Sequence, residues 1–93
     1  NRIRLELAEV THIQGLKDYA IIHTAEKKIV VKGSVKSVHQ LFPPEKFIRV
    51  HKSFIVAKDK VRRIERNKII IGQNEIPVGR NYRTELEQKI MQG

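Results

Sequence analysis

Residues 47–57 read Phe-Ile-Arg-Val-His-Lys-Ser-Phe-Ile-Val-Ala, and this stretch decides the fold. Apolar Ile48 and Val50 alternate with their neighbours, which is the two-residue period of a half-buried strand. An unbroken strand would bury the Lys52 ammonium in the same apolar row, at a cost of several kcal/mol. The sequence therefore predicts a break at residues 51–53 and a new strand from Phe54. The break leaves a polar tip between two anchored strands, a common construction for a recognition loop.

Length and composition restrict the class of protein. The 93 residues suffice for one small domain with a core of Ile, Val and Leu. The sequence has no cysteine, which excludes disulfides and thiolate metal sites, so we expect a reducing, cytoplasmic setting. No apolar run reaches the roughly 20 residues of a membrane span. Because the chain starts at Asn1 rather than at Met, we expect residues 1–93 to be a single domain from a longer protein.

Basic side chains are in excess and unevenly distributed. Nineteen Lys and Arg against ten Asp and Glu give a formal net charge of +9. Residues 1–45 carry seven basic and five acidic side chains, a net of +2, whereas residues 46–93 carry twelve and five, a net of +7. Such an asymmetry attracts a polyanion. Charge alone leaves open a basic surface that serves solubility. An anionic membrane is disfavoured because no stretch pairs a basic face with a broad apolar one.

The rest of the sequence alternates between strand-like and helix-like patterns. Strands are predicted over residues 2–7, 10–13, 19–24, 28–31, 47–50, 54–57, 61–65, 68–71 and 75–78. Apolar spacing over residues 35–42, with Ser34 as N-cap and Pro43-Pro44 as the stop, predicts a short helix. A second helix is expected from Asn81, as its cap, to Met91. The predicted fold class is mostly β, with short antiparallel strands, one short internal helix and a C-terminal helix.

The residue types that perform catalysis or bind metals are present but poorly placed for either. The histidines His12, His23, His39 and His51 lie too far apart in the sequence to form a metal-ligand pair, so no metal site is expected. The first two fall in predicted strands and the third on a helix surface, where structural roles are expected. No nucleophile elbow, phosphate-cradling glycine loop or carboxylate dyad appears, and Ser53 lies too close to His51 along the chain for proton transfer. We expect no enzymatic activity and no cofactor.

A second polar motif occupies residues 76–83, which read Ile-Pro-Val-Gly-Arg-Asn-Tyr-Arg. Pro77 indicates an edge or terminal strand position, and Gly79 permits the positive φ of a sharp change in direction. Arg80 would then project at a corner. There its guanidinium can offer two parallel donors to guanine or bind a phosphate. The alternative is a surface arginine that is solvated or paired with a carboxylate.

Together the two motifs resemble the LytTR family, the DNA-binding output domains of many bacterial response regulators. The resemblance spans essentially the whole chain and includes the early Ile13-Gln-Gly…Asp18-Tyr19 turn. It implies an elongated set of small antiparallel β-sheets that inserts loop side chains into successive major grooves of double-stranded DNA. Three positions depart from the family pattern, which often has Glu, Asn and Ser where this chain has Gln14, Ala57 and Gly79.

The resemblance also implies roles for individual residues. The residues expected to contact DNA bases are Lys17, Lys52 and Arg80, with Tyr19 as the alternative to Lys17 in the same turn. The residues expected to contact the DNA backbone are Tyr19, Arg49, His51, Ser53, Asn81 and Arg83. Backbone contacts set the register, and base contacts set the sequence preference. The resemblance further implies an N-terminal receiver domain and binding as dimers on repeated promoter half-sites.

Two other functions remain as alternatives. A protein-binding β module would add a partner's strand to an exposed sheet edge, but the basic bias of residues 46–93 argues against it. A module for single-stranded RNA or DNA would need solvent-facing aromatic rings for stacking. The two Tyr and three Phe residues are few, and most are expected in the core.

Overall fold

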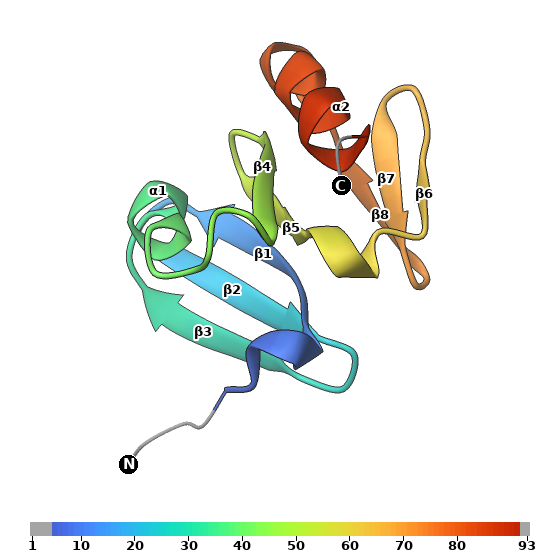
Figure 1. Cartoon of the computed structure of the whole chain (residues 1–93). Coiled ribbons are helices and arrows are strands. Elements are labelled where there is room, and N and C mark those ends of the chain that lie inside the picture. The colour runs from blue at the N-terminus through green and yellow to red at the C-terminus, as the bar shows by residue number, and fades with distance from the viewer. Residues whose placement is uncertain (1–4, 92–93) are drawn as a thin grey trace.

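The computed structural model describes residues 5–91 and confirms a mostly β fold (Figure 1). Within these residues, the strands form a five-stranded antiparallel sheet in the order β3-β2-β1-β5-β4 and a three-stranded antiparallel sheet in the order β6-β7-β8. The body is elongated, with extents of 40 × 23 × 22 Å. No helix in this part of the chain has the length and apolarity needed to cross a membrane.

The elements follow one another as short segments. The strands are β1 (Val10–Leu16), β2 (Tyr19–Thr24), β3 (Lys28–Lys32), β4 (Phe47–His51), β5 (Phe54–Ala57), β6 (Arg63–Ile64), β7 (Lys68–Ile71) and β8 (Asn74–Pro77). The α-helices are α1 (Val35–His39) and α2 (Arg83–Met91), and the 3-10 helices are η1 (Leu7–Glu9), η2 (Lys58–Lys60) and η3 (Arg80–Tyr82).

The β4–β5 hairpin joins the two halves of the molecule. The predicted break is confirmed, because β4 ends at His51 and β5 begins at Phe54. The strand is not half-buried, however, since Phe47 packs into the core under the five-stranded sheet while Ile48 and Val50 pack into a second core. The second core contains buried residues of β7, β8 and α2, which cover the apolar face of Ile48 and Val50, whereas the face that the alternation left to solvent packs through Phe47 into the first core. The hairpin is therefore buried on both faces.

The first half of the chain departs from the prediction at two points. The strand predicted over residues 2–7 is wrong at its described end, where Leu7 begins η1; residues 2–4 lie outside the described part of the chain. Helix α1 begins after Ser34 as predicted, and the Ser34 side chain accepts a hydrogen bond from the Ser37 backbone N–H at 3.1 Å. It ends at His39, so Leu41 is not on a core face and is 79% exposed.

The second half of the chain also departs from the prediction at two points. The strand predicted over residues 61–65 shrinks to Arg63–Ile64. Asn81 does not cap α2, because it lies inside η3 and α2 begins two residues later. Within α2, Glu85 and Lys89 form an ion pair across one helical turn at 2.9 Å.

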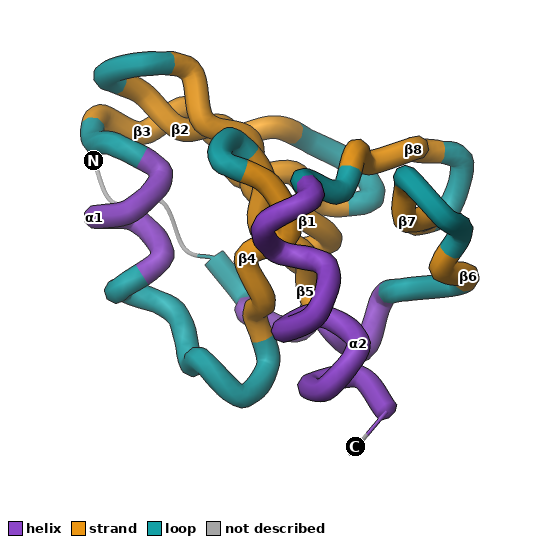
Figure 2. The backbone as a smooth tube through the Cα atoms, turned by 90° about the horizontal axis from the view of Figure 1, so that it is seen from above, coloured by secondary structure: helices purple, strands orange, loops and turns teal. Residues whose placement is uncertain are grey.

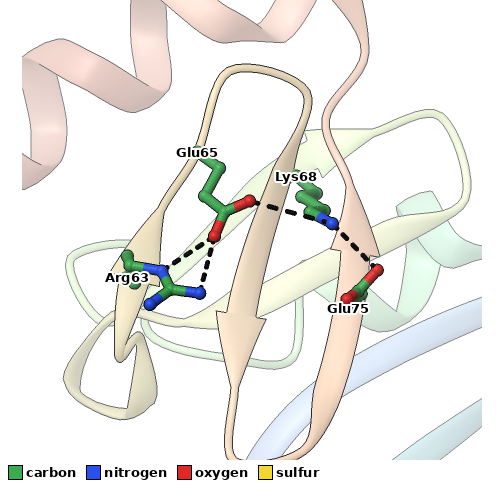
Figure 3. Close-up of polar contacts among 4 residues, drawn as sticks. All are labelled: Arg63, Glu65, Lys68 and Glu75. Atoms are coloured by element: carbon green, nitrogen blue, oxygen red, sulfur yellow. Dashed lines mark hydrogen bonds and ion pairs between the residues drawn. The ribbon is translucent and has the colours of Figure 1, made fainter.

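Four charged side chains of the small sheet and its β6–β7 turn form ion pairs with one another (Figure 3). Glu65 lies 2.7 Å from the guanidinium of Arg63 and 3.7 Å from the Lys68 ammonium. Lys68 also contacts Glu75 at 3.2 Å. These exposed pairs contribute little to stability, about 0–1 kcal/mol each. They compensate Arg63 and Lys68, whereas Arg62 and Arg66 of the same region pair with no described carboxylate.

Candidate nucleic-acid interface

Two backbone hydrogen bonds bring the predicted contact regions together. The Gly15 N–H, near the end of β1, donates to the Ser53 carbonyl at 2.7 Å. The Gly79 N–H, after β8, donates to the Val50 carbonyl at 2.7 Å. The tip at residues 51–53 is thus held on one side by the β1 end and on the other by the segment that leads into α2. Figures 1 and 2 show the tip beside the start of this helix.

The tip has a defined internal structure. The Ser53 backbone N–H donates to Nδ1 of His51 at 3.1 Å, and the His51 ring meets the Phe54 ring edge-on with 5.7 Å between centroids. Because Nδ1 accepts, the neutral imidazole carries its proton on Nε2. His51 therefore offers an N–H donor at the rim of the tip, next to the exposed side chain of Lys52.

Arg49 is engaged with the tip itself. Its Nη2 donates to the Lys52 carbonyl at 2.7 Å and its Nε to the His51 carbonyl at 3.3 Å. The guanidinium carbon also lies 5.7 Å from the ring centroid of Tyr82, within cation–π range. Arg49 therefore holds the tip in place rather than pointing into open solvent. Tyr82 was not among the residues expected to contact DNA, and the contact with Arg49 depends on two segments that lie far apart in the sequence.

The corner before Arg80 is built differently from the prediction. Gly79 has φ −74°, so the expected positive φ is wrong. The glycine is needed for space, because a Cβ there would lie 3.0 Å from Cδ2 of Tyr82 and 3.6 Å from Cα of His51. A side chain at this position would therefore push the corner away from the tip. Arg80 and Asn81 follow as exposed residues of η3.

The positive φ occurs instead in the β1–β2 turn. Lys17 has φ 58°, an uncommon conformation for any residue but glycine. Strand β1 runs further than predicted, to Leu16, which pairs with Tyr19, so the turn consists of Lys17 and Asp18 alone. The Gly33 N–H donates to the Asp18 carbonyl at 2.7 Å, which ties this turn to the start of α1. Lys17 and Tyr19 are both exposed there.

The basic side chains expected to contact DNA bases are not paired with carboxylates in the described part of the chain. No ion pair among residues 5–91 involves Lys17, Lys52 or Arg80. Arg83, which is also an expected contact, donates to Glu87 at 3.1 Å and is partly neutralised. These three turns therefore carry uncompensated positive charge, as do other basic residues such as Lys36 and Lys58 that are in no ion pair within residues 5–91.

Three of the four histidines have structural environments. His12 and His23 pair across β1 and β2 and stack with 4.1 Å between ring centroids. Burial lowers the pKa of His12 from 6.5 to about 4, with the charges of His23 and Lys28 as further causes. Burial also lowers the pKa of His23. His39 is more than a surface residue, because its Nε2 lies 3.0 Å from the Phe47 carbonyl. Among the described residues, no group of three or more His, Cys, Asp or Glu side chains could hold a metal ion.

Comparisons with known proteins agree on one family. The family model described as the LytTr DNA-binding domain matches residues 1–91. The Sensory transduction protein LytT of Enterococcus faecalis is 24% identical over 97 residues, which cover 97% of this chain and 40% of the relative. The chain thus spans about two fifths of that protein's length. A solved LytTr DNA-binding domain from Bacillus cereus superposes with a TM-score of 0.84 at 20% identity, covering 95% of this chain and 86% of that one, and so shares the fold.

Proposed function

The chain belongs to the LytTR family of DNA-binding domains, and we propose that it binds double-stranded DNA sequence-specifically as the output domain of a two-component transcription regulator. One observation carries the proposal. Lys17, Lys52 and Arg80 are exposed on three turns, and no described carboxylate pairs with any of them. The backbone hydrogen bonds of Gly15 and Gly79 fix the two outer segments to the central tip.

The dimensions of the body support contacts in more than one groove. Its long axis of 40 Å slightly exceeds one turn of B-DNA, about 34–36 Å. Side chains on separate turns can then enter successive major grooves, each of which is wide enough to admit a protein element. In this arrangement Lys52 and Arg80 read base edges, and Lys17 supplies the third base contact. The guanidinium of Arg80 offers the two parallel donors that match guanine O6 and N7.

Polar groups around these three residues supply the contacts to the DNA backbone. The Nε2–H of His51 and the hydroxyl of Ser53 donate to phosphates from the tip, and Tyr19 does so from the β1–β2 turn. Asn81 and Arg83 do the same from the start of α2. Arg49 contributes indirectly, because its guanidinium is already bonded to the carbonyls of the tip.

The biological setting follows from the relatives and is part of the proposal. The Enterococcus faecalis relative is described as a sensory transduction protein, and this chain spans only part of its length. A receiver domain N-terminal to this one would then control pairing on repeated promoter half-sites, in the cytoplasm.

The decisive experiment is a selection of bound fragments from random duplex DNA, followed by titration with Arg80→Ala. The variant should lose about 1–3 kcal/mol of binding free energy on the selected duplex and relax the preference at one base pair. Arg63→Ala is the matched control, because Arg63 is an exposed arginine paired with Glu65 on the small sheet. Equal weakening on selected and random duplexes would make Arg80 a phosphate contact. A complex that does not weaken with salt would refute duplex binding altogether.

A second candidate function is supported by the sheet edge at β3. This strand pairs only with β2 among the described strands, and Val30 is 62% exposed. A partner's extended segment could add to this edge. That function predicts weak salt dependence and tolerance of Arg80→Ala, so the same titrations distinguish the two.

A further inference from the structure

A hollow next to Arg80 is lined by three arginines and no carboxylate. Its volume is about 390 Å³, and its lining residues are Arg66, Asn67, Val78, Gly79, Arg80 and Arg83. Within the described chain, Arg66 and Arg80 take part in no ion pair, and only Arg83 shares its charge, with Glu87 at 3.1 Å. Three arginines that line one hollow, two of them without a counter-charge, favour the binding of an anion.

The β6–β7 turn, residues 65–67, is hydrogen-bonded to residues 78–79, the same segment that is bonded to β4 next to the tip. The Val78 N–H donates to the Asn67 carbonyl at 2.9 Å, and the next N–H, of Gly79, donates to Val50 at 2.7 Å. Successive N–H groups of an extended segment point to opposite sides, so this turn and the tip flank residues 78–79. Figure 1 shows the β6–β7 turn and the β4–β5 tip on the same, upper side of the molecule.

Arg66 is available because the neighbouring carboxylates are engaged. Glu65 contacts Arg63 at 2.7 Å and Lys68 at 3.7 Å (Figure 3). Glu87, which lines the adjoining surface together with Arg66, is bonded to Arg83. An arginine at a turn, beside two carboxylates that already have cationic partners, keeps its full charge for an external ligand.

We propose that Arg66 binds a DNA phosphate in this hollow, so that the β6–β7 turn is a fourth point of contact with the duplex. The inference rests on the proposed function and extends it to a turn to which neither the resemblance nor the sequence motifs assigned a role. Arg66 binds phosphate rather than a base edge, since Arg80 lines the same hollow from the corner that reaches the groove. Arginine suits this role because its planar fork matches phosphate oxygens in pairs.

The test compares the salt dependence of duplex binding for the intact domain, Arg66→Gln and Arg63→Gln. The two variants remove the same charge from neighbouring parts of the small sheet, but Arg63 is paired with Glu65. For Arg66→Gln, the slope of log K against log salt should decrease in magnitude by about 0.9, the value for one phosphate contact. Its affinity should fall by the same factor on selected and random duplexes, and Arg63→Gln should retain the slope of the intact domain.

The outcomes separate this inference from the proposal on which it rests. Equal slopes for the two variants would overturn the phosphate contact while leaving duplex binding in place. Weakening by Arg66→Gln on the selected duplex alone would also overturn it, because Arg66 would then read a base. Absence of salt-dependent duplex binding by the intact domain would refute the proposed function itself. Denaturation midpoints of both variants, expected to equal that of the intact domain, confirm that folding is unchanged.

Discussion

Arg49→Ala should destabilise the tip and weaken DNA binding without removing a phosphate contact. The substitution deletes a 2.7 Å hydrogen bond to the Lys52 carbonyl, a 3.3 Å bond to the His51 carbonyl and a cation–π contact with Tyr82 at 5.7 Å. A hydrogen bond from a charged group contributes about 1.5–3 kcal/mol, and the exposure of this one favours the lower end. The ring contact adds about 0.5–1 kcal/mol at an exposed site. We therefore expect the free energy of unfolding to fall by about 2 kcal/mol.

Two measurements check this reasoning. Urea denaturation of Arg49→Ala, Tyr82→Leu and the double variant forms a double-mutant cycle, and the coupling free energy should be about 0.5–1 kcal/mol. Salt titrations of DNA binding should show lower affinity for Arg49→Ala with an unchanged log–log slope, since its guanidinium lies on protein carbonyls. A slope reduced in magnitude by about 0.9, together with an unchanged free energy of unfolding, would show that Arg49 contacts a phosphate and would refute the positioning role.

Two further predictions concern the other half of the molecule. Lys17→Gly and Lys17→Ala should weaken DNA binding equally. In thermal denaturation, Lys17→Gly should be more stable than Lys17→Ala by about 1 kcal/mol, because only glycine adopts φ 58° without strain. Equal stabilities of the two variants would contradict that strain. Because burial lowers the pKa of His12 to about 4, the unfolded chain binds more protons between that pH and 6.5, and stability should fall as pH falls through this window. The free energy of unfolding, measured by urea denaturation at several pH values, should fall by about 3 kcal/mol at most. In His12→Gln this loss should largely disappear. An equal loss in the variant would show that His12 is not its cause.

The local structure of the β4–β5 hairpin could be predicted because one residue made the alternative costly. Burying Lys52 in the row of Ile48 and Val50 was unfavourable, and the chain does break there. The burial of the opposite face could not be predicted in the same way. It depends on the first core, in which Phe47 joins residues of β1 and β2 such as Ile13 and Ile22, which lie far from the hairpin in the sequence and leave no local pattern in residues 47–57.

The structure places the candidate contact residues Lys17, Lys52 and Arg80 on exposed turns, but the sequence did not predict the backbone that carries them. The sequence placed the positive φ at Gly79, where glycine is permissive, but the structure has it at Lys17. Glycine at 79 serves close packing against Tyr82 and against the His51 backbone, and turn statistics do not report how a corner packs against a distant segment such as the tip. The expectation that Asn81 caps α2 failed for a related reason, since η3 takes up the residues between the corner and the helix.

Charged residues differ in whether they have a partner of opposite charge, and the candidate contact turns carry residues without one. The described carboxylates of the small sheet and of α2 contact nearby cations, so they do not offset the charge of other basic residues. The turns that bear Lys17, Lys52, Arg66 and Arg80 have no such partners within residues 5–91. Because the hairpin behind the central tip is buried on both faces, these charges sit on a rigid base. Under the proposed function, the turns that position the domain on DNA also contribute to its attraction, and because these side chains are exposed, we expect their substitution to leave both cores intact.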